Sequence, residues 1–146
     1  MNKSPTRAEY KVFYPILTRW KDNDTYGHIN NVEYYSYFDT VVNLHLIENK
    51  ALDIHASEII GFVVNSGCTF VEPVAYPDCL EVGLRVEKLG RSSTQYGVAI
   101  FKDGADTASA YGHMVHVFVD RKTNKSVTIP DNIRRVLEDL SLDVIK

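Results

Sequence analysis

Several features that would assign a function class are scarce or missing in this sequence. No apolar run approaches the length of a membrane-spanning helix, and the segment "MNKSPTRAEY" lacks the apolar core of a secretory signal. The net charge of −3 leaves no basic excess for contacts with the phosphates of nucleic acid. We therefore expect a protein that has neither a membrane nor nucleic acid among its partners.

Cysteine is also scarce, and its two residues, Cys68 and Cys79, form no CxxC pair. We interpret them as reduced thiols that serve as small core residues of a cytoplasmic protein. No G-x-S-x-G motif occurs. Four histidines have no partnered nucleophile in the sequence and are interpreted as strand or surface residues: His45, His55, His113 and His116.

What is present is typical of an ordinary globular protein. The chain has 146 residues, of which 45% are hydrophobic and 24% are charged. We find no repeat, no low-complexity segment and no linker. The sequence therefore predicts one domain over residues 1–146.

The first half of the chain predicts a strand followed by a long helix. Residues 10–19 are rich in β-branched and aromatic residues, and Pro15 indicates an edge strand or a bulge. In "NVEYYSYFDTVVNLHLIENK" polar residues recur at helical spacing, and most of the remaining circumference is apolar, which predicts a mostly buried helix. Asn30 can cap this helix, and Glu33 completes a capping-box-like pair.

The second half has the period of two that indicates strands. We expect strands over 61–72, 80–90, 93–102 and 107–119, with Asp103-Gly104 as a hairpin turn and "IPDNIRRVLEDL" as a short terminal helix. This order predicts an α+β fold in which a strongly curved five-stranded antiparallel sheet, four of its strands in meander order, wraps around one long central helix. Such a sheet leaves a face or an edge uncovered, which predicts dimerisation at least.

The chemistry of the chain concentrates in residues 19–34, "RWKDNDTYGHINNVEY". One interpretation is a metal loop, because Asp22, Asp24, Gly27 and Glu33 occupy positions 1, 3, 6 and 12 of a calcium EF-hand. However, Tyr26 at position 5 supplies no usual ligand oxygen, and the preceding segment is not helical. A transition-metal site of His28 with one of the two aspartates is the other metal interpretation. We expect no metal.

A second interpretation is structural, with the carboxylates and asparagines only capping the helix and shaping the turn. A third is catalytic. The unpaired N–H groups of a helix N-terminus can polarise a carbonyl and stabilise its oxyanion. Asp24 is close enough in sequence to fold back over the helix start, where it can attack the carbonyl or activate water.

The loop and two later segments resemble a known family. "DNDTYGHINNVEYYSYFD", "VEPVAYPDCLEVGLRVEKLGRSS" and "HVFVDRKTNKSVTIP" are similar, in this order, to hot-dog-fold acyl-CoA thioesterases of the 4-hydroxybenzoyl-CoA thioesterase family. The resemblance covers nearly the whole chain. It implies hydrolysis of an acyl-CoA thioester without a cofactor, since coenzyme A is part of the substrate. It also implies a homodimer, assembled further into a tetramer or a higher oligomer.

The resemblance also implies roles for particular residues. The family's catalytic aspartate, three residues before the glycine, corresponds to Asp24, and its oxyanion donor corresponds to the backbone N–H of Asn31. Asp22 then becomes a carboxylate that shapes the loop. Residues expected at the substrate are Gly27, His28, Asn30 and Tyr34. The turn "KLGRSS" offers groups that suit the phosphates of coenzyme A, namely Lys88, Arg91, Ser92 and Ser93.

Several alternatives stay open at this point. "KLGRSS" also fits a plain polar turn, and the aromatic start of the helix fits either an acyl pocket or ordinary core. One branch of the fold uses an acidic residue on the helix, for which Asp39 is the candidate, although it lies roughly 12 Å past the helix start. A hydratase or dehydratase that uses His28, or an acyl-CoA-binding module without catalysis, would also fit the same fold.

Overall fold

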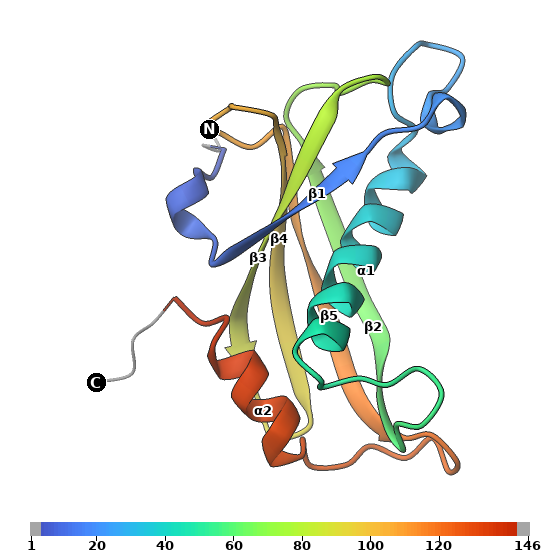
Figure 1. The fold of residues 1–146 in the computed structure, drawn as a ribbon, viewed down its shortest axis with the longest axis vertical. Helices are drawn as coiled ribbons and strands as arrows, with labels where there is room; N and C mark the ends of the chain where they lie inside the picture. Colours follow the sequence, from blue (N-terminus) through green and yellow to red (C-terminus); the bar gives the residue numbers. More distant parts are fainter. Residues whose placement is uncertain (1–3, 143–146) are drawn as a thin grey trace.

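The computed structural model describes residues 4–142, so the two ends of the predicted domain, residues 1–3 and 143–146, lie outside the described residues. Figure 1 shows a long sheet with helix α1 running along it and helix α2 at its lower end. The strands are β1 (Val12–Leu17), β2 (Ile59–Phe70), β3 (Cys79–Leu89), β4 (Ser93–Lys102) and β5 (Ala110–Asp120). The helices are α1 (Asn31–Glu48), α2 (Asp131–Glu138) and the 3-10 turns η1 (Arg7–Glu9) and η2 (Trp20–Asp22).

The five strands form one antiparallel sheet in the order β1-β3-β4-β5-β2. The predicted α+β architecture, a five-stranded antiparallel sheet with a long helix and a short C-terminal helix, is confirmed. β1, which contains Pro15, lies at an edge as predicted. The expected meander of four strands is wrong in one respect, because β2 pairs with β5 and lies at the opposite edge from β1. Only β3, β4 and β5 follow one another as neighbours.

Helix α1 begins where the sequence predicts. Asn30 is the N-cap, and its side-chain oxygen accepts a hydrogen bond from the Val32 N–H at 3.1 Å. The capping box predicted between Asn30 and Glu33 does not form. The Asn30 N–H donates to the Asp22 carbonyl at 2.9 Å, and the Glu33 side chain lies near Arg19. The helix is also less buried within one chain than predicted, because Val32, Tyr35 and Ile47 are exposed.

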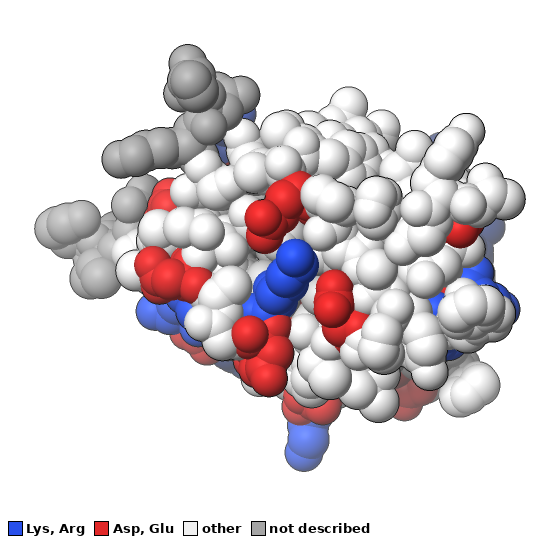
Figure 2. Space-filling model, turned by 90° about the horizontal axis from the view of Figure 1, so that it is seen from above, with Lys and Arg blue, Asp and Glu red and all other residues white. Residues whose placement is uncertain are grey.

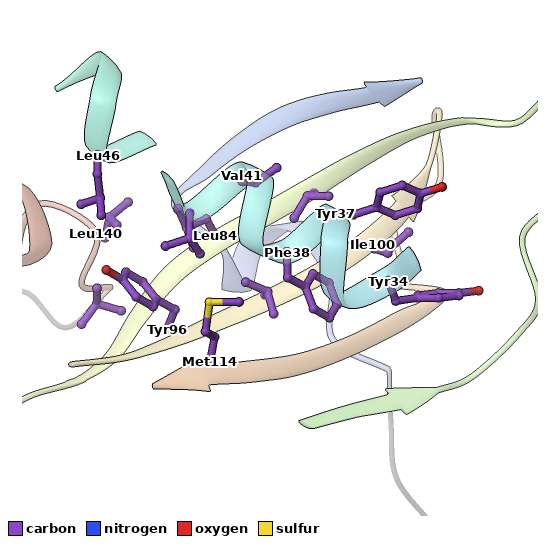
Figure 3. Close-up of a cluster of buried hydrophobic side chains, with 14 of the residues drawn as sticks. Tyr34, Tyr37, Phe38, Val41, Leu46, Leu84, Tyr96, Ile100, Met114 and Leu140 are labelled. Carbon is purple, nitrogen blue, oxygen red and sulfur yellow. The ribbon is translucent and has the colours of Figure 1, made fainter. Parts of the chain in front are cut away.

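The core lies between the buried face of α1 and the side of the sheet that curves around it. Figure 3 shows Tyr34, Phe38 and Val41 of the helix directed toward the strands, with Tyr96 and Met114 opposite. Leu140, just after α2, joins the same cluster beside Leu84. Alternate residues of β4 supply this core, as the period of two predicts, and they are Tyr96, Val98 and Ile100.

The structure corrects the predicted environments of one cysteine and one histidine. Both cysteines are free thiols, but Cys79 is exposed and only Cys68 packs against the core. His45 is buried in α1, where its Nδ1 lies 2.6 Å from the Tyr14 hydroxyl, so it is neither a strand nor a surface residue. Among residues 4–142 no helix is both long and apolar enough to span a bilayer.

Candidate active site

The loop between β1 and α1 is closed by its own backbone. An isolated bridge joins Asn23 and Ile29, and inside it the Asp24 N–H donates to the His28 carbonyl at 2.8 Å. Gly27 has a φ of 85°, a left-handed conformation that residues with a side chain rarely adopt. This tight turn brings Asp24 back toward the start of α1, as its place in the sequence allows.

Two bonds tie the loop to the connection between β2 and β3, residues 71–78. The Ile29 N–H donates to the Val74 carbonyl at 2.8 Å, and the Tyr76 N–H donates to the Asn23 side chain at 3.0 Å. The site is therefore built from three segments: the loop, the first turn of α1 and residues 70–73.

Asp22 anchors the loop to the helix. It is fully buried, and its carboxylate accepts hydrogen bonds from the Arg19 backbone and guanidinium and from the Tyr37 hydroxyl at 2.7 Å. Burial raises the pKa of the Asp22 carboxyl, but the bonds from Arg19 and Tyr37 outweigh burial and hold the pKa below its ordinary value. Its oxygens are thus occupied by protein donors. This arrangement fits the loop-shaping role and leaves no place for a calcium ion at position 1.

Asp24 faces a cleft of about 440 Å³. Its Oδ1 accepts hydrogen bonds from the backbone N–H groups of Tyr26 at 2.8 Å and His28 at 3.3 Å. Among the described residues its Oδ2 has no donor. One oxygen therefore fixes the carboxylate while the other stays available for chemistry.

The first amide of α1 lies in the same cleft. The N–H groups on either side of it are engaged, Asn30 by the Asp22 carbonyl and Val32 by the Asn30 side chain. Within residues 4–142 the Asn31 N–H has no acceptor. An unpaired amide at the positive end of a helix is suited to receive a carbonyl oxygen on which negative charge develops.

The predicted site residues divide into two groups. Asp24, His28, Asn31 and Tyr34 all line the cleft. Gly27 and Asn30 do not line it, because the first forms the turn and the second caps the helix. Tyr34 is buried, and its ring meets Phe70 edge to face at 4.8 Å. Burial raises the pKa of its hydroxyl.

Sequence reasoning missed the opposite wall of the cleft, which residues 70–73 supply. Glu72 is held there by the Ser109 hydroxyl at 3.1 Å, and Lys102 lies 3.9 Å from it. Residues 71–73 belong to a segment that resembles the family, but the resemblance assigned them no role at the site, because hydrogen bonds of Val74 and Tyr76, far along the chain, bring this segment to the loop. Among the described residues no group of three metal-ligating side chains gathers here or elsewhere.

The turn with Lys88, Arg91, Ser92 and Ser93 lies at the other end of the sheet. β3 begins beside the loop, where Cys79 pairs with Leu17, and runs to this turn at the end that carries α2 (Figure 1). Its length, at about 3.3 Å per residue, separates the turn from the cleft by roughly 30 Å. Arg91 bonds the Thr128 hydroxyl at 3.1 Å. Within one chain the structure does not bring the turn and the cleft together.

Figure 2 views the molecule from the end onto which the loop projects. Acidic and basic side chains are interspersed there among a majority of uncharged ones, and neither sign forms a continuous field. The cleft itself is lined by two acidic residues, Asp24 and Glu72, set among apolar walls from Ile29, Phe70 and Val71.

Comparison with known proteins agrees with the geometry. A model of the thioesterase-like superfamily matches residues 18–137, which include the loop, the cleft, helix α1 and strands β2 to β5 but not β1. The chain belongs to the thioesterase-like superfamily.

Among solved structures, the PA5185 protein of Pseudomonas aeruginosa strain PAO1 has 51% identity and a TM-score of 0.93, over 95% of this chain and 97% of that one. A 1,4-dihydroxy-2-naphthoyl-CoA thioesterase of Synechocystis has 17% identity and a TM-score of 0.78, over 88% of this chain and 96% of that one, and shows the shared fold. A protein of Aquifex aeolicus (strain VF5), provisionally named an esterase, is 28% identical over 86% of this chain and 97% of its own length. The fold of this thioesterase-like protein is thus the hot-dog fold.

Proposed function

We propose that this thioesterase-like protein hydrolyses an acyl-CoA thioester to the free acid and coenzyme A. The observation that carries the proposal is the pairing of two free groups in one cleft: the Oδ2 of Asp24 and the N–H of Asn31. One is a base or nucleophile and the other is an oxyanion donor. Thioester hydrolysis needs this combination.

In the proposed reaction the thioester carbonyl oxygen accepts a hydrogen bond from the Asn31 N–H. Asp24 either removes a proton from the attacking water or attacks the carbonyl carbon itself to form a mixed anhydride that water then opens. In both routes a C–O bond forms, the C–S bond breaks, and the thiolate of coenzyme A leaves and takes up a proton. Water is the only co-reactant, so the reaction calls for neither a metal nor an organic cofactor.

The finer features predicted from the family resemblance are part of the same proposal. These are membership of the 4-hydroxybenzoyl-CoA thioesterase family, a cytoplasmic location, and roles at the substrate for Gly27, His28, Asn30 and Tyr34. The homodimer is supported by β2, a 12-residue strand with no partner on its outer side among the described residues. Contact between coenzyme A and the turn at 88–93 requires a second subunit, because one chain keeps the turn and the cleft apart.

The test is thiol release from a panel of acyl-CoA esters with short, branched, long and aromatic acyl groups. Asp24→Asn removes the base and the nucleophile but keeps an acceptor oxygen for the loop. We expect it to lose at least about two decades of rate on every ester that the wild type hydrolyses, while its unfolding midpoint stays near that of the wild type. Asp39→Asn is the matched control, because this exposed aspartate on α1 does not line the cleft.

The outcomes separate the candidate functions. If Asp24→Asn retains its rate and Asp39→Asn loses it, the carboxylate on the helix is the catalytic one and the proposed mechanism is wrong. If neither the two variants nor the wild type hydrolyse any ester, although coenzyme A esters bind, the protein is a binding module.

A hydratase or dehydratase is the second candidate, since His28 lies in the cleft beside Asp24. Such an enzyme acts on the acyl chain and leaves the thioester bond intact. Product analysis on α,β-unsaturated and β-hydroxy acyl-CoA esters distinguishes it, because no free thiol is then formed.

A further inference from the structure

The chain carries an exposed aromatic pair that the cleft does not use. Trp20, the single tryptophan of the sequence, is 77% exposed, and its ring meets Tyr76 edge to face at 6.1 Å and 83°. Tyr76 is itself 40% exposed. Most of the Trp20 ring thus packs against nothing within residues 4–142. A tryptophan in this state is free to stack on a planar ligand.

The pair lies on two connections that also contribute residues to the cleft, the loop and the β2–β3 connection, residues 71–78. Trp20 opens the loop, and its carbonyl accepts the Asn23 N–H at 3.3 Å. Asn23 in turn binds the backbone of Tyr76 through its side chain at 3.0 Å. Tyr76 follows Pro73, which lines the cleft, by three positions. A ligand that leaves the cleft along this side therefore meets the aromatic pair.

The charge beside the pair favours a phosphorylated ligand. Lys21 follows Trp20 directly, is exposed, and has no ion-pair partner among the described residues. Arg19, on the other side, is engaged by Asp22 at 2.9 Å and lies 3.7 Å from Glu33. An ammonium group next to an aromatic surface matches a base that carries phosphates.

We propose that Trp20 and Tyr76 bind the adenine base of the coenzyme A portion, with Lys21 at its phosphates. This inference rests on the proposed function, because it takes the ligand in the cleft to be a coenzyme A thioester. It places the nucleotide on the chain whose Asp24 performs the reaction, whereas the turn at 88–93 would act only across a dimer.

The first test uses Trp20 as its own reporter. Since the protein has no other tryptophan, its tryptophan fluorescence comes from this site alone. We expect saturable quenching by coenzyme A and by adenosine 3′,5′-bisphosphate or ADP, and none by pantetheine, which lacks the base. Quenching by pantetheine alone, or by none of these probes, overturns the inference.

The second test is kinetic. Trp20→Ala is compared with wild type on an acyl-CoA ester and on the N-acetylcysteamine ester of the same acid, which lacks the nucleotide. Loss of one stacked base predicts a KM increase of roughly tenfold for the coenzyme A ester, with kcat unchanged. Kinetics on the N-acetylcysteamine ester stay at wild type, and Trp20→Phe recovers most of the loss. Ile54→Ala, an exposed apolar residue away from the cleft, is the matched control.

The results also separate this inference from the proposed function. Equal losses on both esters, or a smaller oligomer of Trp20→Ala in sedimentation, would show a structural or interface role and overturn it. If Lys88→Ala with Arg91→Ala raises KM and Trp20→Ala does not, the nucleotide binds at the turn instead. If no ester is hydrolysed, the fluorescence titration still decides whether the pair binds adenine.

Discussion

His116 shows at the scale of one residue how burial sets a charge state. It lies on β5 at 2% exposure, with its Nδ1 3.2 Å from the Tyr96 hydroxyl and its ring edge to face with that of Tyr96. A methyl group on Gly61 would stand 2.7 Å from the same nitrogen, so the ring packs directly against the backbone of β2 and leaves no room for a side chain at position 61. Burial lowers the pKa of His116 to about 4, which means that the folded chain holds a neutral imidazole at neutral pH.

This pKa predicts a loss of stability in mild acid. Between pH about 4 and 6.5 the unfolded chain binds a proton at His116 that the folded chain does not, so the free energy of unfolding rises with pH across this window. The contribution is fully present above pH 6.5 and falls away toward pH 4, by about 3 kcal/mol in all. Urea unfolding at several pH values and one fixed protein concentration measures the slope.

His116→Gln should flatten that slope, whatever its effect on stability at neutral pH. His55→Gln, at an exposed histidine, should keep the wild-type slope. A variant at position 116 with an unchanged slope would mean that other groups cause the acid sensitivity.

At the scale of elements, the junction of η2 and α1 depends on Asp22. This buried carboxylate connects Arg19 before the loop to Tyr37 in the second turn of the helix. In Asp22→Asn one acceptor oxygen becomes an NH2 group. This donor then faces the donor group of Arg19 or Tyr37, and that hydrogen bond is lost. We expect the free energy of unfolding to fall by about 2 kcal/mol, since Arg19 is partly solvated and tolerates the loss better than a buried cation would.

The urea midpoint measures this change, and Asp39→Asn serves as the exposed control, with an expected effect within about 0.5 kcal/mol. Because Asp24 reaches the cleft through the same loop, Asp22→Asn should also slow thioester hydrolysis. Unchanged stability together with normal hydrolysis would contradict the anchoring role of Asp22.

The same junction shows which features the sequence could predict. The cap at Asn30 and the turn at Gly27 depend on neighbouring residues, and local patterns predicted both. Glu72 and Phe70 were missed because long-range hydrogen bonds, from Ile29 to Val74 and from Tyr76 to Asn23, bring their segment to the loop. The edge position of β2 was missed for a similar reason, since a period of two identifies a strand but not its neighbour.

At the scale of the whole molecule, β2 is the feature that one chain leaves unfinished. Its outer edge has no partner among the described residues, and Phe62, Val63 and Val64 are exposed in a row. Val64 falls at the register shift between Val63 and Asn65, where it pairs with no residue of β5. An exposed apolar edge of this length is suited to pairing with a second copy of the chain.

We therefore expect the chain to dimerise through this edge, and Val64→Lys to convert that proposed dimer to a monomer. The side chain is 57% exposed in the single chain, so a lysine there fits the folded monomer but places a charge within the predicted interface. Sedimentation velocity measures the change, and Ile54→Lys, at an exposed residue outside the sheet, should leave the dimer intact. If the turn at 88–93 serves the cleft of the other subunit, thiol release from coenzyme A esters should fall as the dimer dissociates. A monomer with full activity would show instead that each chain carries a complete site, and a dimer that survives Val64→Lys would place the interface on another surface.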